Sequence, residues 1–243
     1  MSKRLLDRQV SLIEHLTSAG AIYGDGTGSN PSEALHGIDP GLLRIEARFS
    51  HEKRMEKIAG VFPRTFDLLG ARRERIVREF VDACPPSDIS RIENARQFHD
   101  FLTARRRRHP PLPSYLPEVA ACELACAKVR VAFENSAAED APAPPRPAVR
   151  RRPDIVLLRC TFDIRSVFEG GGDHRAPVER ETLLAVAAAP DSGEPRILEL
   201  TPEIFDLLGA LDAWTNPAAH DGSPQAAALM ADLAEAGVLE LRR

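Results

Sequence analysis

A proline- and alanine-rich stretch, AAEDAPAPPRPA at residues 137–148, divides the chain into two parts with different hydrophobic patterns. Such a composition is typical of an extended, semi-rigid segment. Before it, apolar residues recur at three- and four-residue steps, which is the period of amphipathic helices. After it, short β-branched runs occur together with helical ones. We therefore expect a helical domain over residues 1–135, a linker over residues 136–153, and a second domain over residues 154–243.

The first domain is expected to be all α-helical, with five or six helices. Its apolar positions keep a helical spacing between stops made by glycine and by pairs of prolines. Pro40 and Pro63 stand where a first-turn proline is tolerated, because the N–H that proline lacks has no helical partner there. The expected helices lie near residues 5–20, 40–58, 63–69, 76–81, 92–102 and 115–133.

The second domain is expected to combine strands and helices. Its apolar, β-branched runs predict strands at residues 155–162, 182–187, 196–200 and 238–241. Thr201 is a favourable N-cap residue before a first-turn proline, so it predicts the start of one helix. Another helix is expected from Pro224 to Ala236. This order has the outline of a small winged-helix-like unit, and the predicted fold class of the whole chain is α+β.

The two domains differ in charge. Residues 154–243 hold 7 basic and 16 acidic side chains, whereas residues 1–135 hold 21 basic and 18 acidic ones. A winged helix that reads DNA needs cations facing the phosphates, and an acidic domain would repel them. Only 5% of all residues are aromatic, which leaves few rings for stacking on bases. The charge pattern favours peptide recognition, with a DNA-binding regulator as the alternative.

Cysteine usage and hydropathy indicate a reduced, cytoplasmic protein. The four cysteines are too few for a disulfide scaffold, and no apolar run reaches the roughly 18 residues that span a membrane. Cys122 and Cys126 lie one turn apart, but no second pair of ligands completes a zinc site. The sequence also has no recognisable nucleophile motif. We expect no metal and no catalytic residue in this chain, and an enzyme that uses the two cysteines is a third possibility.

A helix dense in charges of both signs is expected over residues 44–57. Charged side chains one turn apart usually form a solvated face. Because an apolar and basic segment follows directly, the functional interpretation is a docking surface for a partner protein. The residues expected to form it are Arg48, His51, Arg54, Phe62, Arg64 and Phe66.

Several motifs follow one another in the region of residues 44–135. They are RFSHEKR at 48–54, VFPRTFDLLG at 61–70, FHDFL at 98–102 and PLPSYLPEVA at 111–120. This series resembles the helical domain of the HvfC/BufC-like, MbnC-like and TglI-like partner subunits of multinuclear non-haem iron oxidative enzymes. The C-terminal half matches that family more loosely, in outline.

The resemblance implies a non-catalytic subunit in the maturation of ribosomally synthesised peptides (RiPPs). Such a subunit forms a heterodimer with a TIM-barrel enzyme, which holds the iron and modifies Cys, or sometimes Asp or Asn, residues of a precursor peptide. The resemblance further implies that the leader of the precursor adds a strand to a sheet edge and packs against a helix. The residues expected to bind it are Arg196, Ile197, Leu198, Glu199 and Leu200 on the strand, and Gln225, Leu229 and Asp232 on the helix.

Overall fold

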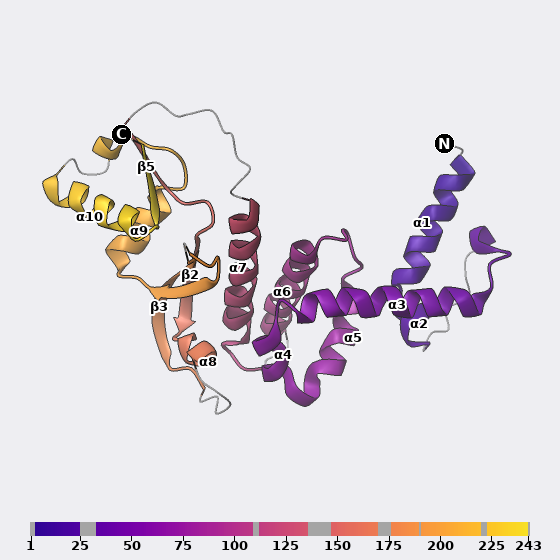
Figure 1. The fold of residues 1–243 in the computed structure, drawn as a ribbon. Helices are drawn as coiled ribbons and strands as arrows, with labels where there is room; N and C mark the ends of the chain where they lie inside the picture. Colours follow the sequence, from indigo (N-terminus) through magenta and orange to yellow (C-terminus); the bar gives the residue numbers. More distant parts are fainter. Residues whose placement is uncertain are drawn as a thin grey trace. The chain divides into compact units, whose positions relative to one another are not determined.

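The computed structural model shows an α+β protein and describes residues 3–24, 33–108, 112–135, 147–169, 176–189, 191–219 and 223–242 (Figure 1). Two compact units divide the chain, Met1–Pro117 and Glu118–Arg243. The first unit is helical in its described residues, and the second contains every described strand. The strands and helices of each unit are considered separately below.

The N-terminal unit has a helix at each position where the hydrophobic spacing predicts one. Asp39 caps its longest helix by accepting a hydrogen bond from the Gly41 amide, and Pro40 occupies the first turn, as expected. Gly70 has a φ of 50° at the end of the following helix, a conformation that favours glycine. The elements are α1 (Lys3–Thr17), α2 (Ala19–Tyr23), η1 (Glu33–Leu35), α3 (Pro40–Ala59), α4 (Pro63–Leu69), η2 (Gly70–Arg72), α5 (Arg73–Ala83) and α6 (Arg91–Arg108).

An aromatic cluster forms the interior of this unit. Phe98 of α6 is fully buried, and its ring centroid lies 5.1 to 5.5 Å from those of three other phenylalanines, Phe62, Phe66 and Phe80. These separations are typical of favourable edge-to-face and offset ring pairs. The Phe98 side chain of α6 therefore holds α4 and α5 together with its own helix.

The next helix, α7 (Leu116–Asn135), lies almost entirely in the C-terminal unit, although the sequence pattern grouped it with the preceding helices. Near its start, the Glu118 carboxylate accepts hydrogen bonds from the amides of Thr161 and Phe162, each 3.1 Å long. Near its end, the Phe133 ring packs against Gly193 so closely that a Cβ there would lie 2.6 Å from ring carbon Cδ1. Because both ends contact the same sheet, α7 is a layer of the C-terminal unit.

The C-terminal unit contains two antiparallel sheets. A three-stranded sheet has the order β2-β3-β4, formed by β2 (Val156–Phe162), β3 (Glu179–Ala188) and β4 (Pro195–Glu199). Leu158 pairs with Leu184, and Val186 pairs with Ile197. The remaining elements of the unit are α8 (Arg165–Glu169), α9 (Pro202–Ala210), η4 (Pro217–Ala219) and α10 (Pro224–Glu235). The strands and longer helices expected from the sequence are present, whereas the one-turn-scale α8 was not expected.

A second, two-stranded sheet corrects the expected linker. Residues 148–151, which the composition placed in the linker, form β1 (Ala148–Arg151), paired with β5 (Leu239–Arg242). Val149 is fully buried, and Arg150 donates to Glu240 across the pair with a length of 2.7 Å. The strand was missed because it has no apolar alternation and two of its four residues are arginines, while the acid that pairs with Arg150 lies 90 residues away in the chain.

The three-stranded sheet has a helical layer on each face. Leu157, Ala185 and Ala187 share one face and pack into a core with Leu208 of α9 and Met230 of α10. Cys160 points to the other face, because side chains alternate along a strand, and it lies near Glu118 of α7. The sheet is therefore covered on both faces, and its two edges are the places where main-chain groups can meet another chain.

Candidate peptide-binding edge and docking surfaces

The outer edge of β4 presents main-chain groups that the sheet does not use. The Leu200 amide donates to Leu183 O, and the Ala189 amide donates to Glu194 O. Hydrogen bonding alternates along an antiparallel pair, so residues 196 and 198 also face β3. The N–H and C=O groups of Ile197 and Glu199 therefore point away from the sheet, and no hydrogen bond between described residues reaches them.

The opposite edge differs, because a side chain occupies part of it. The register of β2 is interrupted between Cys160 and Phe162, and at this irregularity Glu118 binds the Thr161 and Phe162 amides. A bulge capped in this way ends the run of main-chain donors that an added strand would need. In the described residues the β2 edge is therefore closed at its Thr161 end, whereas no side chain caps the outward groups of Ile197 and Glu199 on β4.

Along β4, the side chains combine exposed apolar and charged groups. Leu198 is 39% exposed, Arg196 is exposed, Ile197 is half-buried, and Leu200 contributes to the core below α9. Glu199 is tied into an ion-pair network that it shares with Arg165, Arg180 and Asp163, with N–O distances of 2.6 to 3.0 Å. Hydrogen bonds from Arg165 and Arg180 hold the pKa of Asp163 well below its usual range. This network fixes the end of β4 while its outer main-chain groups stay exposed.

The expected helical side of the site lies on α10, which packs against β5. Gln225 and Asp232 are exposed and Leu229 is half-buried, while Met230 of the same helix enters the core that also contains Leu200. The strand and helix residues predicted to bind one peptide thus border a common core. The strand belongs to the three-stranded sheet, whereas the helix packs against β5 of the two-stranded sheet.

The docking residues expected from the sequence are only partly at the surface. Phe62 is fully buried and Phe66 is 6% exposed, so both are core residues, and the expectation that they form a docking surface is corrected. The reason is that both rings pack against Phe98, Phe62 from the N-cap position of α4 and Phe66 from within that helix. Arg54 also turns inward, since its guanidinium lies 4.6 Å from the centre of the Phe80 ring.

The other predicted docking residues have partners within the chain. Arg54 donates to Asn94 and Gln97, with lengths of 2.8 and 2.9 Å. The His51 ring lies 3.4 Å from the Tyr23 hydroxyl through Nε2, and burial lowers the pKa of this histidine. Arg48 remains exposed, with a long contact of 3.4 Å to the Ile22 carbonyl, and Arg64 lies 4.0 Å from Asp67.

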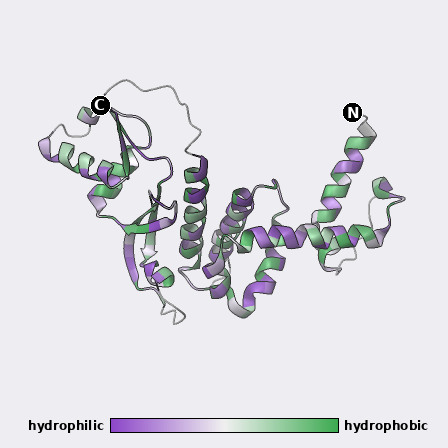
Figure 2. Cartoon of the chain, in the orientation of Figure 1, coloured by the Kyte–Doolittle hydropathy of each residue, from purple (hydrophilic) through white to green (hydrophobic). Residues whose placement is uncertain are grey.

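Sequence reasoning missed the exposed apolar faces of α1 and α3. The side chains are 46 to 63% exposed, and at positions 6, 10 and 13 and positions 42, 45 and 49 they follow helical spacing. Figure 2 shows the hydrophobic residues interspersed along both helices. The periodicity had identified these residues as sharing a face, but a periodic pattern does not tell what covers that face. They are Leu6, Val10, Ile13, Leu42, Ile45 and Phe49, here called the apolar stripes.

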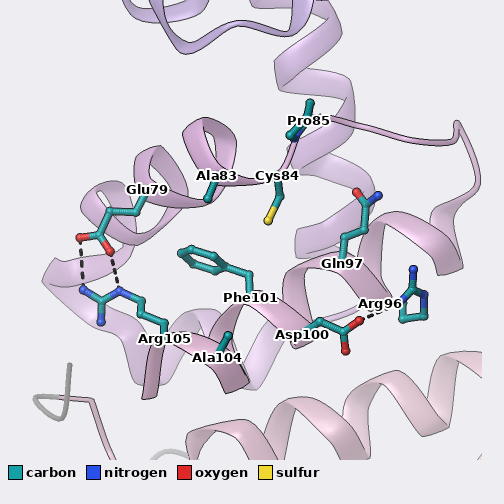
Figure 3. A pocket seen from close by; sticks show the side chains of 10 residues that line it. All are labelled: Glu79, Ala83, Cys84, Pro85, Arg96, Gln97, Asp100, Phe101, Ala104 and Arg105. Carbon is teal, nitrogen blue, oxygen red and sulfur yellow. Dashed lines mark hydrogen bonds and ion pairs between the residues drawn. The ribbon is translucent and has the colours of Figure 1, made fainter. Parts of the chain in front are cut away.

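A cleft of about 570 Å³ between α5 and α6 places charges of both signs side by side (Figure 3). Arg105 is 7% exposed and donates to Glu79 through Nε and Nη2, and Arg96 donates to Asp100. In Figure 3 the Cys84 sulfur points toward Phe101, and burial raises the pKa of this thiol. Since the two arginines are neutralised locally, the cleft has no excess of positive charge for an anion.

The paired cysteines of α7 are packed inside the C-terminal unit. Cys122 is fully buried and hydrogen-bonds to the Cys126 sulfur, which lowers the pKa of Cys126 and raises that of Cys122. Burial raises the pKa of Cys160 to about 12. Within the described residues, no cluster of three or more His, Cys, Asp or Glu side chains is arranged to hold a metal ion.

Comparison with models of known protein families finds no match, and a search of curated protein sequences finds none either. None of the described helices combines the length and the apolar character that crossing a membrane requires.

Proposed function

We propose that this chain is a non-catalytic partner subunit in RiPP maturation. It binds the leader of a precursor peptide and presents the peptide to a TIM-barrel multinuclear iron enzyme, which modifies Cys (or Asp or Asn) residues. The supporting observation is the uncovered outer edge of β4, with the main-chain groups of Ile197 and Glu199 pointing outward. The motifs at residues 44–135 supply the link to the enzyme partner.

The leader binds by strand addition. Main-chain hydrogen bonds to an open edge give affinity with little demand on the peptide sequence, and side-chain pockets add selectivity. Leu198 offers an exposed apolar contact at the centre of β4. In this role the three-stranded sheet with α9 and α10 acts as a winged-helix-like recognition element, and α10 supplies its helical wall.

The charge of the C-terminal part favours a basic peptide over DNA. Residues 154–243 hold 16 acidic side chains against 7 arginines. Acids on α9 include Glu203 and Asp206, both exposed, and α10 adds Asp232 and Glu235. A polyanion would be repelled by this surface, whereas a leader with Lys or Arg residues gains in association rate and affinity.

The iron enzyme docks on the apolar stripes of α1 and α3. Exposed apolar side chains of this size, gathered on two helices that contact each other, are typical of a surface that a partner covers. Arg48 lies exposed on α3 and adds a charge beside the stripe. This surface replaces the buried Phe62 and Phe66 of the original expectation.

Leader binding is tested with Ile197→Pro. The substitution removes an outward N–H and leaves the hydrogen bonds between β3 and β4 in place, because Ile197 does not donate to β3. We expect a fluorescein-labelled leader, taken from a short Cys-containing peptide encoded beside this gene, to bind the full chain with a Kd below about 1 μM. The variant should bind it at least about tenfold more weakly.

The matched control is Arg159→Pro, which removes an outward N–H at the β2 edge instead. Equal affinity of the two variants would show that β4 is not the binding edge. A duplex DNA that shifts at moderate salt, with no leader binding, would establish the alternative of a DNA-binding regulator.

Partner docking is tested by co-expression with the TIM-barrel iron enzyme of a neighbouring gene. We expect co-purification as a heterodimer that is lost in the variant Ile45→Asp/Phe49→Asp, because charges are placed in the covered apolar contact. Lys128→Asp, at an exposed position of α7 in the other unit, serves as the control. Retention of the heterodimer by the stripe variant would contradict this docking surface.

A further inference from the structure

A second cavity, of about 250 Å³, lies in the N-terminal unit among α1, α2, α3 and the segment after α5. Apolar side chains supply much of the cavity lining, and one of them, Val81, is buried. Ile89 also lines the cavity and is 86% exposed, so it is an apolar group that a ligand at the cavity mouth can reach. The apolar lining residues are Leu16, Ile22, Val81, Pro86 and Ile89.

Cationic side chains from one helix converge on this cavity. Lys53, Arg54 and Lys57 of α3 line it, and Asp88 is the one carboxylate in its lining. Among 32 basic residues the chain has only four lysines, Lys3, Lys53, Lys57 and Lys128, so half of them are found here. A lysine presents a compact charge on a flexible stem, which suits a single anionic group at a cavity mouth.

The cations differ in how far they are already engaged. Arg54 is held by Asn94 and Gln97, and Lys57 donates to the Ile89 carbonyl with a length of 3.0 Å. The Lys53 amine has no hydrogen-bond or ion-pair partner in the part of the chain described by the structure. Lys53 and Lys57 lie one helical turn apart, so both can reach the same group.

An apolar cavity with a few convergent polar groups is the usual form of a small-molecule site. We propose that this cavity binds a small amphipathic carboxylate, whose apolar tail contacts Ile22, Val81 and Ile89 and whose carboxylate lies between Lys53 and Lys57. The cation excess excludes an amine, and the apolar walls exclude an ion without a tail. This site is separate from the β4 edge and from the apolar stripes, so it stands or falls independently of the proposed function.

The His51 ring forms part of the same wall and is fixed on its other side by Tyr23. The pKa of His51 is lowered, first by burial and then by Arg54, so this ring is neutral at pH 7.5. The charged side chains at the mouth are therefore Lys53, Lys57 and Arg54, opposed by Asp88.

The proposal is tested with octanoate, titrated into the full chain by isothermal calorimetry at pH 7.5. Three comparison ligands separate tail from head: acetate lacks the tail, octanol lacks the charge, and octylamine reverses it. We expect octanoate to bind at least about tenfold more tightly than each of them. Octanol or acetate binding as tightly as octanoate would overturn the proposal, as would the absence of any heat with octanoate at two well-separated temperatures, because apolar burial makes the binding enthalpy change with temperature.

Variants locate the site on the chain. Lys53→Glu/Lys57→Glu should weaken octanoate binding about tenfold or more. Ile89→Asp should also weaken it, because it replaces an apolar contact of the octanoate tail with a charge. Both changes are at exposed positions, so the thermal unfolding midpoint checks that the fold is kept. Lys128→Glu, an exposed lysine of α7 in the other unit, is the matched control and should bind as the unaltered chain does. Unchanged affinity in the lysine double variant would overturn the assignment of this cavity.

Discussion

The two units leave different kinds of group uncovered. The N-terminal unit exposes apolar side chains on α1 and α3, whereas the C-terminal unit exposes main-chain donors and acceptors on β4. A helix satisfies its own backbone, so its surface can offer a partner only side chains. A strand at a sheet edge offers backbone groups whatever its side chains are. The first surface therefore suits a fixed protein partner, and the second suits peptides that vary in sequence.

The contrast between covered and uncovered phenylalanines gives the largest expected effect. Phe98→Ala should lower the free energy of unfolding of the N-terminal unit by about 3–5 kcal/mol, because it leaves a cavity among three rings. Phe49→Ala, at a side chain that is 54% exposed, should change it by about 0.5 kcal/mol or less. Urea unfolding followed by circular dichroism measures both. Similar losses in the two variants would mean that the α3 stripe is covered within the chain.

The second-largest expected change in stability concerns the turn between β3 and β4. Gly193 has a φ of 71° and no room for a Cβ beside Phe133, so Gly193→Ala should cost about 2 kcal/mol. Gly209→Ala is the control within α9, where nothing lies within 4 Å of the added methyl group. That change should stabilise the protein by about 0.5–1 kcal/mol. Thermal unfolding of the two variants in opposite directions would support the packing of α7 on this turn.

The β2 edge should become more like the β4 edge when the Glu118 carboxylate is removed. Glu118→Ala leaves the Thr161 and Phe162 amides without their acceptor and should cost about 1–2 kcal/mol. It should also allow self-association through β2, which light scattering over a range of protein concentrations detects. Glu118→Gln keeps one acceptor oxygen, so it should lower the stability less than Glu118→Ala does. A monomeric, fully stable Glu118→Ala protein would show that the β2 edge is closed by other means.

The smallest effect concerns pH in the N-terminal unit. The folded-state pKa of His51 is lowered by burial and by Arg54, below the ordinary value of 6.5 that the unfolded chain has. The unfolded state therefore takes up a proton first as pH falls, and stability decreases from about pH 7 downward until the folded pKa is passed. His51→Gln should show a weaker decrease in unfolding free energy between pH 7.5 and 5.5. An identical pH dependence in both proteins would contradict a buried, neutral imidazole.

Local signals predicted the elements themselves. Pro40, and Pro202 with Thr201, mark helix starts because capping and first-turn geometry involve only neighbouring residues. β1 was hidden, because its arginines gain strand character only from partners such as Glu240. Likewise α7 carries an ordinary helical pattern, and nothing local to it states that Glu118 and Phe133 will contact a sheet.

Of the candidate sites, the sequence located β4 and its flanking helices, because alternation and caps are readable along the chain. Its hydrophobic pattern does not make β4 an edge strand, since strand order depends on pairing between distant segments; the edge position was expected from the family resemblance, and the order β2-β3-β4 has β4 at an edge. Phe62 was expected at the surface for the same reason: Phe62 and Phe49 are both apolar residues in helical patterns, and only packing decides that the first is buried and the second exposed. Spacing along a helix or strand is fixed by backbone geometry, whereas the neighbour that covers a face is fixed by the tertiary structure.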